Sequence, residues 1–550
     1  MRIEILDKVM VIDANARGRG RRFSTLDVIG VGPRLIVSLL KSYGLYADLM
    51  PYEVFVRDPS IAKEFDVLAI SYMVSDVVAV KKAIEIWRKL NRDGIVVLGG
   101  PGTLDTDTLT ELDFDLAFKG ESEVTLDNIF SRYRSLYDVL HGVREQEIQP
   151  GLVVKLSGRR LIDGGIGCWV PRELINRVMP DVDSVTKYPF YWASRVYVEV
   201  VRGCSNFYRP VLAAGASCLG CNICRSGNLS SRIRCPIGIP PGCGYCSVPA
   251  IHGPARSREM DIIVREVKAL IKAGVTRVIL SAPDFLDYGR DFLVDDLLTD
   301  PCNPKPNVDA IDRLLHSLTS ITEVAEGGAT ISIENVKPCL VTEEVAEILG
   351  RYLKDSVVYI GVESCSDRLL KSIGRPSMYS ESLKAIELLS KYGLRPYVYL
   401  MHGLPSECDE DIKSTLACID IFRSLGVEKI VLYRFTPLPY TAFSSSPRPE
   451  PAVSNPIKAI LYRSVTNFNR DRKYGLLNRV IDVVIAARYR DPRYLVSYPL
   501  RHGPVVLIRA SKNFIGTIAT IRVTGVKSDR LVYGELIYVK KRLKPRQHIQ

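Results

Sequence analysis

One cysteine-rich stretch, residues 201–246, decides how this chain is interpreted: VRGCSNFYRPVLAAGASCLGCNICRSGNLSSRIRCPIGIPPGCGYC. Seven of the 13 cysteines of the 550-residue chain fall within it: Cys204, Cys218, Cys221, Cys224, Cys235, Cys243 and Cys246. Cysteine is among the most frequently buried residue types. We therefore expect single core thiols at the other six positions, which are Cys168, Cys302, Cys339, Cys365, Cys408 and Cys418.

The spacing within this stretch is typical of iron–sulfur ligands. C-x2-C-x2-C at 218–224, followed by Cys235-Pro236, is the ferredoxin type of pattern, in which four thiolates hold a [4Fe–4S] cluster. A disulfide framework would leave one cysteine over, and structural zinc would use only four of the thiols. The seven cysteines could divide into one set of four and one set of three. Three thiolates leave one iron of a cubane free to bind a further group.

Strand-like and helical segments alternate on both sides of the stretch. Before it, the alternation predicts a Rossmann-like parallel sheet at 1–150, followed by an irregular connector at 151–195. After it, six β/α units predict a partial (β/α)6 TIM-like barrel at 196–445, with a cysteine-rich insertion at 205–242. The strand candidates of this barrel are 196–202, 276–281, 329–334, 356–362, 396–401 and 429–434.

The end of the chain is basic and rich in β-type runs. A helical connector is expected at 446–500 and a small OB-like β-barrel at 501–543. Residues 461–550 carry 19 Lys and Arg against five Asp and Glu, although the whole chain has a net charge of only +12. This asymmetry favours a polyanionic partner such as nucleic acid. The alternative is a charged thermophile surface, which the four glutamines of the chain also favour.

The residues VEVVRGC at 198–204 and PPGCGYCSVPAIHGPARSR at 240–258 resemble the radical S-adenosylmethionine (radical SAM) enzymes. The usual motif of that family is C-x3-C-x2-C after the first barrel strand, with an aromatic residue before the last cysteine, as Tyr245 is here. In this chain 38 residues separate Cys204 from Cys243. The resemblance implies a [4Fe–4S] cluster and S-adenosylmethionine as cofactors, and a 5′-deoxyadenosyl radical as the reactive species.

Two assignments of the cysteines remain open at this point. In the first, Cys204, Cys243 and Cys246 bind the catalytic cluster, and Cys218, Cys221, Cys224 and Cys235 bind an auxiliary one. In the second, Cys204 and Cys235 exchange roles, which makes C-x7-C-x2-C the catalytic set. We favour the first, because Cys204 sits where the first barrel strand ends.

The resemblance extends along the barrel through YIGVESCSDRLLKSIGRP at 359–376, YLMHGLPSECDEDI at 399–412 and FTPLPYT at 435–441. By matching position, the candidates for holding S-adenosylmethionine are Tyr245, Ser281, Asp284, Glu363 and Gly403. Ser281-Ala282-Pro283-Asp284 stands where relatives have GGE, so Asp284 is expected to supply the missing carboxylate. A barrel-end ion pair is the alternative role for Glu363. No individual catalytic residue is assigned.

The first domain resembles the cobalamin-binding-type domain that precedes many radical SAM barrels, through residues 68–87, 96–104 and 114–126. The usual DxHxxG cobalt ligand is missing. Cobalamin with an unliganded lower face and a packing domain without cofactor are the two alternatives. Gly99, Gly100 and Gly102 form the turn that would approach a bound cobalamin, although a glycine run alone is weak evidence.

Residues 504–537 resemble a TRAM domain, the RNA-binding β-barrel of tRNA methylthiotransferases and RNA methyltransferases. The resemblance implies phosphate contacts from Arg509, Lys512, Arg522, Lys527 and Arg530. It also makes Phe514, Tyr533 and Tyr538 candidates for base stacking, with a role in the core as the alternative. Methylthiotransferases carry three auxiliary-cluster cysteines in their N-terminal domain, and this chain has none there.

The leading hypothesis is a radical SAM enzyme that modifies RNA, in particular tRNA, by methyl or methylthio transfer. A radical SAM enzyme acting on a lipid or small metabolite is the first alternative, and a non-catalytic iron–sulfur RNA-binding protein is the second. RNA and a reductant protein are the expected partners. No run of about 18 apolar residues and no secretory leader are visible, so we expect a cytoplasmic protein without a membrane span.

Overall fold

The structure is a computed structural model of the whole chain, and it describes residues 7–14, 27–143, 148–156, 158, 160–211 and 221–543. It divides into two compact units, and the boundary along the chain lies between Val196 and Tyr197. No helix in the described ranges has both the length and the apolar character needed to cross a bilayer.

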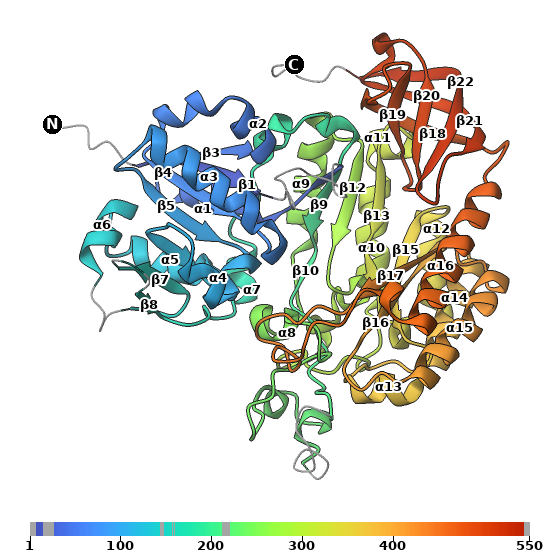
Figure 1. Ribbon diagram of the computed structural model, residues 1–550, viewed down its shortest axis with the longest axis horizontal. Helices are drawn as coiled ribbons and strands as arrows, with labels where there is room; N and C mark the ends of the chain where they lie inside the picture. Colours follow the sequence, from blue (N-terminus) through green and yellow to red (C-terminus); the bar gives the residue numbers. More distant parts are fainter. Residues whose placement is uncertain are drawn as a thin grey trace. The chain divides into compact units, whose positions relative to one another are not determined.

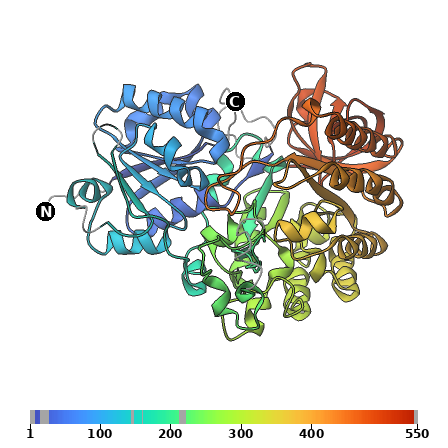
Figure 2. The same ribbon diagram turned by 60° about the horizontal axis from the view of Figure 1, so that its bottom comes forward.

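A twisted, mostly parallel sheet organises the first unit (Figure 1). The strand order is β3 (Tyr46–Pro51), β1 (Lys8–Asp13), β4 (Val67–Ser71), β5 (Ile95–Gly99) and β6 (Leu116–Phe118), all parallel. Continuous apolar runs such as KVMVID are typical of strands that are buried on both faces. Helices accordingly cover both faces of the sheet (Figure 2), among them α1 (Gly32–Ser42) and α3 (Val77–Leu90). The predicted Rossmann-like arrangement is confirmed.

Two further strands join this sheet beyond the predicted boundary at residue 150. Strand β7 (Leu152–Lys155) pairs antiparallel with β6, and β8 (Leu161–Asp163) pairs with β7. The first part of the expected connector at 151–195 is therefore sheet. The apolar run Leu152–Val154 is fully buried, and Gly164 and Gly165 follow the hairpin rather than mark a linker.

The second unit holds the partial barrel. The barrel consists of two sheets. Strands β9 (Arg195–Glu199), β12 (Arg277–Ser281) and β13 (Thr330–Ile333) belong to the first sheet, and the second sheet begins with β14 (Asn335–Val336). The strand order in the second sheet is β14, β15 (Val357–Glu363), β16 (Arg395–His402) and β17 (Lys429–Arg434), and all neighbours pair in parallel. Among the described residues β9 and β17 do not pair, so the barrel stays open. All six predicted strands are present.

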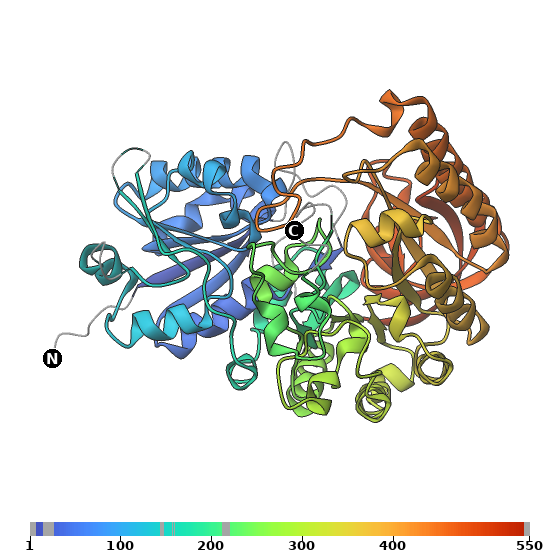
Figure 3. The same ribbon diagram turned by 90° about the horizontal axis from the view of Figure 1, so that it is seen from below.

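Amphipathic helices follow the barrel strands and lie on the outside of the barrel (Figure 3). They are α9 (Met260–Lys272), α10 (Val308–Thr319), α12 (Glu343–Leu353), α14 (Tyr379–Lys391) and α15 (Asp409–Ser424). Each buries one apolar stripe, as Ile263, Val267 and Leu270 do in α9. This arrangement directs the carboxyl ends of all six strands to one side of the barrel, where TIM-like folds build their sites.

A closed five-stranded barrel ends the second unit, in the order β18 (Val480–Arg488), β19 (Tyr494–Pro499), β20 (Val505–Arg509), β22 (Leu531–Arg542) and β21 (Thr517–Val526). The OB-like barrel is confirmed, but it begins earlier than residue 501. The helical connector predicted over 446–500 is wrong for its last part, because helix α16 (Pro456–Tyr474) ends at Gly475. The β-branched run VIDVVI then forms β18.

The scattered cysteines differ from the expectation of single core thiols. Cys302 and Cys339 form a disulfide, and Cys168 and Cys408 are exposed. Only Cys365 and Cys418 are buried free thiols, as predicted. Sequence spacing does not reveal a disulfide between residues 37 positions apart, because the barrel topology brings their loops together.

Reduction of this disulfide should lower the free energy of unfolding by about 3–4 kcal/mol, the loop-closure contribution for a loop of this length. Chemical denaturation of Cys302→Ser with Cys339→Ser, compared with the parent chain, measures the loss. Cys365→Ser is the control and leaves the effect of a reductant on stability unchanged. Peptide mapping without reductant that found both thiols free would contradict the pairing.

Candidate active site

The first barrel strand places Cys204 at the edge of the barrel mouth. Strand β9 continues into β10 (Val201–Arg202), and Gly203 follows with a φ of +80°. A Cβ on Gly203 would lie 2.2 Å from the carbonyl oxygen of Pro254, so only glycine allows this approach. The Cys204 amide then donates to the Gly253 carbonyl at 3.0 Å. Cys204 is thereby fastened to the loop that follows the last cysteines of the stretch.

Asn206 brings Cys204 and Cys243 together. Its backbone amide donates to the Cys204 Sγ at 3.4 Å, and its side-chain amide donates to the Cys243 Sγ at 3.2 Å. The Cys246 amide donates to the carbonyl of Cys243 at 2.8 Å, which closes a tight turn around Tyr245. Three thiols that are 39 and three positions apart in sequence thus meet in one place.

These thiols are shielded from water. Burial, followed by the charge of Cys243 and then that of Cys204, raises the pKa of Cys246 to about 12. Burial raises the pKa of Cys204 to about 11, although Lys337 opposes the shift. Such thiols ionise readily only when a metal replaces the proton. Among the described residues no three Cys, His, Asp or Glu side chains converge on a single metal ion. A [4Fe–4S] cluster needs wider spacing, because each thiolate binds a different iron.

Arg375 connects this cysteine group to the end of the fourth barrel strand. Its guanidinium lies 3.6 Å from the Cys243 Sγ, 3.4 Å from the Tyr245 hydroxyl and 3.8 Å from the Glu363 carboxylate. Glu363 ends β15 with a φ of +66°, a strained conformation for a residue with a side chain. Burial raises the pKa of Glu363, and Arg375 opposes the shift. Glu363 therefore does form the barrel-end ion pair, at the mouth of the barrel.

Two other predicted residues also lie at strand ends. Ser281 ends β12, and its hydroxyl donates to the Glu334 carboxylate at 2.9 Å. The amide of Gly403, just past β16, donates to Glu407 at 2.7 Å, and Glu407 pairs with Lys458 at 2.8 Å. Both polar groups therefore reach the same side of the barrel as Cys204.

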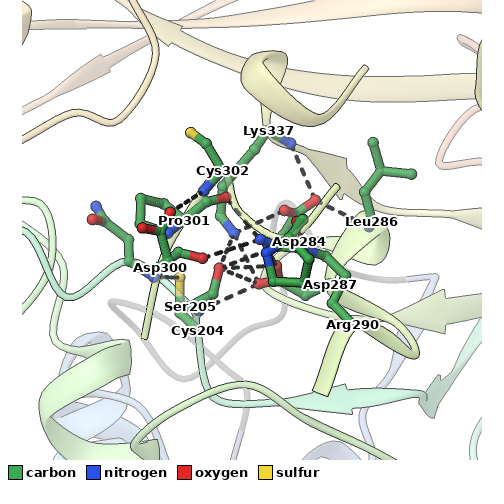
Figure 4. A network of polar contacts seen from close by, with 12 residues as sticks. Cys204, Ser205, Asp284, Leu286, Asp287, Arg290, Asp300, Pro301, Cys302 and Lys337 are labelled. Atoms are coloured by element: carbon green, nitrogen blue, oxygen red, sulfur yellow. Dashed lines mark hydrogen bonds and ion pairs between the residues drawn. The ribbon is translucent and has the colours of Figure 1, made fainter. Parts of the chain in front are cut away.

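Asp284 lies elsewhere than expected (Figure 4). Its side chain is 1% exposed. It accepts hydrogen bonds from the amides of Leu286 and Lys337, both at 3.1 Å, and pairs with the Lys337 ammonium at 2.9 Å. The Asp284 carboxylate thus binds groups inside the protein. This geometry gives no support to the expectation that Asp284 replaces the GGE contact.

The Asp284–Lys337 pair belongs to a buried ionic network beside Cys204 (Figure 4). Lys337 also pairs with Asp287 at 2.8 Å, and Asp287 pairs with Arg290. The network reaches the neighbour of Cys204 because the Ser205 hydroxyl lies 2.6 Å from the Lys337 ammonium and 2.9 Å from an Asp287 oxygen. Two carboxylates face two cations, so their formal charges cancel, although the Asp284 Oδ2 has the Lys337 ion pair and no hydrogen bond.

The remaining cysteines of the stretch lie apart from this group. Cys221, Cys224 and Cys235 line a cavity of about 610 Å³ in the second unit. Cys218, the fourth member of the predicted set, lies outside the described residues. The charged side chains that line the cavity are all cationic: Arg209, Arg225, Arg234, Lys371 and Arg375. Arg375 therefore belongs to both cysteine groups, since it also contacts Cys243.

In the first unit the three glycines of the predicted turn lie after β5. Gly99 and Gly100 line an apolar cavity of about 80 Å³, far smaller than the usual range for ligand sites. Gly102 packs against the buried ring of Tyr72, where a Cβ would come within 2.1 Å of the ring. The described residues therefore fit at most a small part of a cobalamin in this conformation.

The predicted RNA-binding cations are all exposed on the C-terminal barrel: Arg509, Lys512, Arg522, Lys527 and Arg530. Tyr538 is 52% exposed, whereas Phe514 packs against the barrel core and Tyr533 is half-buried. The exposure agrees with a nucleic-acid interface for the cations and for Tyr538. Phe514 takes the alternative role in the core.

Four further residues of the site escaped the sequence analysis. Asn206, Glu334 and Arg375 have the contacts described above, and none of them belongs to a recognisable spacing pattern. The fourth, His402, ends β16 with a buried Nδ1 that has no hydrogen-bond partner in the described structure. Burial, with Lys458 and Arg434 nearby, lowers the pKa of His402 to about 4. Its imidazole is therefore neutral near pH 7.

Comparisons with known proteins agree with this geometry. The model of the radical SAM superfamily matches residues 234–419. An uncharacterized protein of Methanopyrus kandleri is 37% identical over 536 residues, which are 96% of both chains. The tRNA-2-methylthio-N(6)-dimethylallyladenosine synthase of Thermus thermophilus is 23% identical over 56% of this chain and 63% of its own. The ribosomal protein uS12 methylthiotransferase of Pseudothermotoga lettingae is 24% identical over 64% of this chain and 70% of its own.

Two solved structures share the fold. The radical S-adenosylmethionine methyltransferase TsrM of Kitasatospora setae, solved with cobalamin and a [4Fe–4S] cluster, has a TM-score of 0.54 at 15% identity. The match covers 80% of this chain and 74% of TsrM. The cobalamin-dependent enzyme OxsB, solved with aqua-cobalamin and S-adenosylmethionine, has a TM-score of 0.52 at 14% identity. The match covers 85% of this chain and 56% of the OxsB chain. With three cysteines gathered at the mouth of an open (β/α)6 barrel, this chain belongs to the radical SAM superfamily, whose members use a [4Fe–4S] cluster and S-adenosylmethionine.

Proposed function

We propose that Cys204, Cys243 and Cys246 hold the catalytic [4Fe–4S] cluster. The observation that carries this assignment is the double contact of Asn206 with the sulfurs of Cys204 and Cys243. Cys235 is in a separate position, on the cavity that also contains Cys221 and Cys224. The geometry therefore favours the first of the two cysteine assignments, in which Cys204 and not Cys235 is catalytic.

The protein groups around these thiols have distinct tasks. When bound, the cluster and S-adenosylmethionine supply the electron and the 5′-deoxyadenosyl radical. Asn206 and Arg375 donate to the sulfur of Cys243, and hydrogen bonds to cluster sulfurs are one of the means by which proteins set a reduction potential. Tyr245, Glu363, Ser281 and Gly403 remain the candidates for contact with S-adenosylmethionine. We add Glu334 to them in place of Asp284, because Ser281 already holds it at the strand ends.

We propose an auxiliary [4Fe–4S] cluster at Cys218, Cys221, Cys224 and Cys235. Its support is the ferredoxin-type spacing together with the cationic lining of the cavity, which suits the negative charge of a thiolate-bound cluster. Arg375 lies between this cavity and Cys243, so its charge acts on both clusters.

The anaerobically reconstituted chain should contain about eight irons, as two four-iron clusters require. The double variant Cys221→Ala with Cys224→Ala should retain about four and still cleave S-adenosylmethionine to 5′-deoxyadenosine. Arg375→Gln should shift the midpoint potentials of both clusters in an EPR titration. Lys371 lines the same cavity and, among the described residues, makes no hydrogen bond with Cys243, so Lys371→Gln should shift only the auxiliary one. An iron content of about four in the parent chain would contradict the second cluster.

For the reaction we propose methyl or methylthio transfer to RNA, with tRNA as the first candidate. The support is the radical SAM barrel, the basic C-terminal β-barrel and the similarity to two methylthiotransferases, one of which acts on tRNA. The similarity to a ribosomal protein methylthiotransferase keeps a protein substrate as the second candidate. A reductant protein would supply the electron.

Cobalamin is the candidate third cofactor, supported by the fold shared with TsrM and OxsB. The cavity of about 80 Å³ beside Gly99 and Gly100 does not admit it without rearrangement, so we assign it no step. Cobalt content after reconstitution with hydroxocobalamin tests the assignment. One cobalt per chain supports it, and none leaves the first unit as a packing domain.

Binding of the purified chain to total tRNA should weaken steeply with salt, since each phosphate contact releases counterions. Replacing Arg509, Arg522 and Arg530 by Gln should reduce the slope of log affinity against log salt by about two to three. Mass spectrometry of tRNA nucleosides from a deletion strain then identifies the product. If the chain does not bind tRNA above background at low salt, the proposal that it acts on RNA is contradicted. A peptide or lipid whose mass changes in the deletion strain would favour that molecule as the substrate.

A further inference from the structure

The hairpin between β18 and β19 presents tyrosines and cations at one end of the C-terminal barrel. It reads Tyr489-Arg490-Asp491-Pro492-Arg493-Tyr494 and is closed by the Tyr489 amide, which donates to the Tyr494 carbonyl at 2.9 Å. Sequence analysis had placed these residues in a connector, outside the predicted RNA-binding module. In the structure they belong to the barrel.

Two half-buried tyrosine rings lie beside Lys527, and a third packs against one of them. Its ammonium lies 5.8 Å from the centre of the Tyr489 ring and 5.3 Å from that of Tyr533, and it donates to the Tyr533 hydroxyl at 3.0 Å. The rings of Tyr494 and Tyr533 are 5.5 Å apart. We call Tyr489, Tyr494 and Tyr533 the tyrosine platform. All three come from different strands or turns, so no sequence pattern shows it.

Three cations around the tyrosine platform have no carboxylate partner among the described residues, so they can bind a phosphate group. Arg490 stands 5.5 Å from the Tyr489 ring centre and donates to its hydroxyl at 3.2 Å. Arg509 is exposed opposite Tyr494 in the β19–β20 register. Within the described part of the chain, Arg490, Arg509 and Lys527 form no ion pair with a carboxylate. Arg493 differs, since Asp491 binds it at 2.8 Å.

We propose that the tyrosine platform, with Arg490, Arg509 and Lys527, binds single-stranded RNA by stacking unpaired bases on the rings and contacting their phosphates. This inference rests on the proposed RNA function and narrows it to unpaired nucleotides, because paired bases keep their faces stacked inside a duplex. Lys527 and Arg490 now donate to the hydroxyls of Tyr533 and Tyr489. A strand can displace them because each cation gains a phosphate and each ring gains a base.

The test is fluorescence anisotropy of the full-length chain with a labelled ten-nucleotide oligouridine and with a ten-base-pair RNA duplex. Tyr489→Ala should weaken oligouridine binding roughly 5- to 100-fold, the loss expected for one stacked base. Tyr489→Phe should restore the affinity, since it keeps the ring. Tyr462→Ala is the matched control, because Tyr462 is exposed on α16, outside the C-terminal barrel, and is absent from the tyrosine platform. Its affinity should equal that of the parent chain.

A second variant keeps the test valid if Tyr489→Ala does not fold. Arg490→Gln with Lys527→Gln should reduce the salt slope of oligouridine binding by about 1.4. Duplex binding should change little in Tyr489→Ala, because paired bases do not stack on the rings. Unchanged oligouridine affinity in a folded Tyr489→Ala, or an equal loss for the duplex, would overturn the tyrosine platform while leaving RNA binding itself in place. A parent chain that binds neither RNA would overturn the RNA function and the tyrosine platform together.

Discussion

The buried ionic network of Asp284, Asp287, Arg290 and Lys337 is the constraint on which the active site depends. It lies beneath the turn after the first barrel strand, and Ser205 joins it directly to Cys204. Removing one partner of such a pair leaves an uncompensated buried charge, which costs about 3–5 kcal/mol. The network therefore holds in place Cys204, the one cysteine of the proposed catalytic set that an insertion separates from the other two. The rest of the site, from Asn206 to Arg375, is arranged around that fixed position.

The insertion explains how one chain can provide two cysteine groups without an additional domain. A shorter C-x3-C-x2-C loop would keep all three catalytic thiols on one turn, whereas here Cys204 and Cys243 are joined through Asn206. Described residues of the insertion, together with Lys371 and Arg375, line the cationic cavity that contains Cys221, Cys224 and Cys235. Arg375 contacts one group and lines the cavity of the other, so its positive charge acts on both groups.

Much of this architecture could be predicted from sequence, because apolar periodicity and cysteine spacing are local signals. The strands that end in Ser281, Glu363 and His402 were found in that way. The misses have a common cause, which is contact between residues distant in sequence. Asp284 was expected at the barrel mouth because its position matched a family motif, but Lys337, 53 residues later, draws it into the interior. The Cys302–Cys339 disulfide and the tyrosine platform also depend on topology, and β18 was hidden behind the helical pattern that ends at Gly475.

The account is tested most directly by the production of 5′-deoxyadenosine from S-adenosylmethionine by Cys204→Ala and Cys235→Ala, each reconstituted and reduced without oxygen. Cys204 lies with Cys243 and Cys246, and Cys235 lies with Cys221 and Cys224. Loss of 5′-deoxyadenosine in Cys204→Ala and its continued formation in Cys235→Ala is the predicted result. The reverse pattern would contradict the assignment of the catalytic cluster.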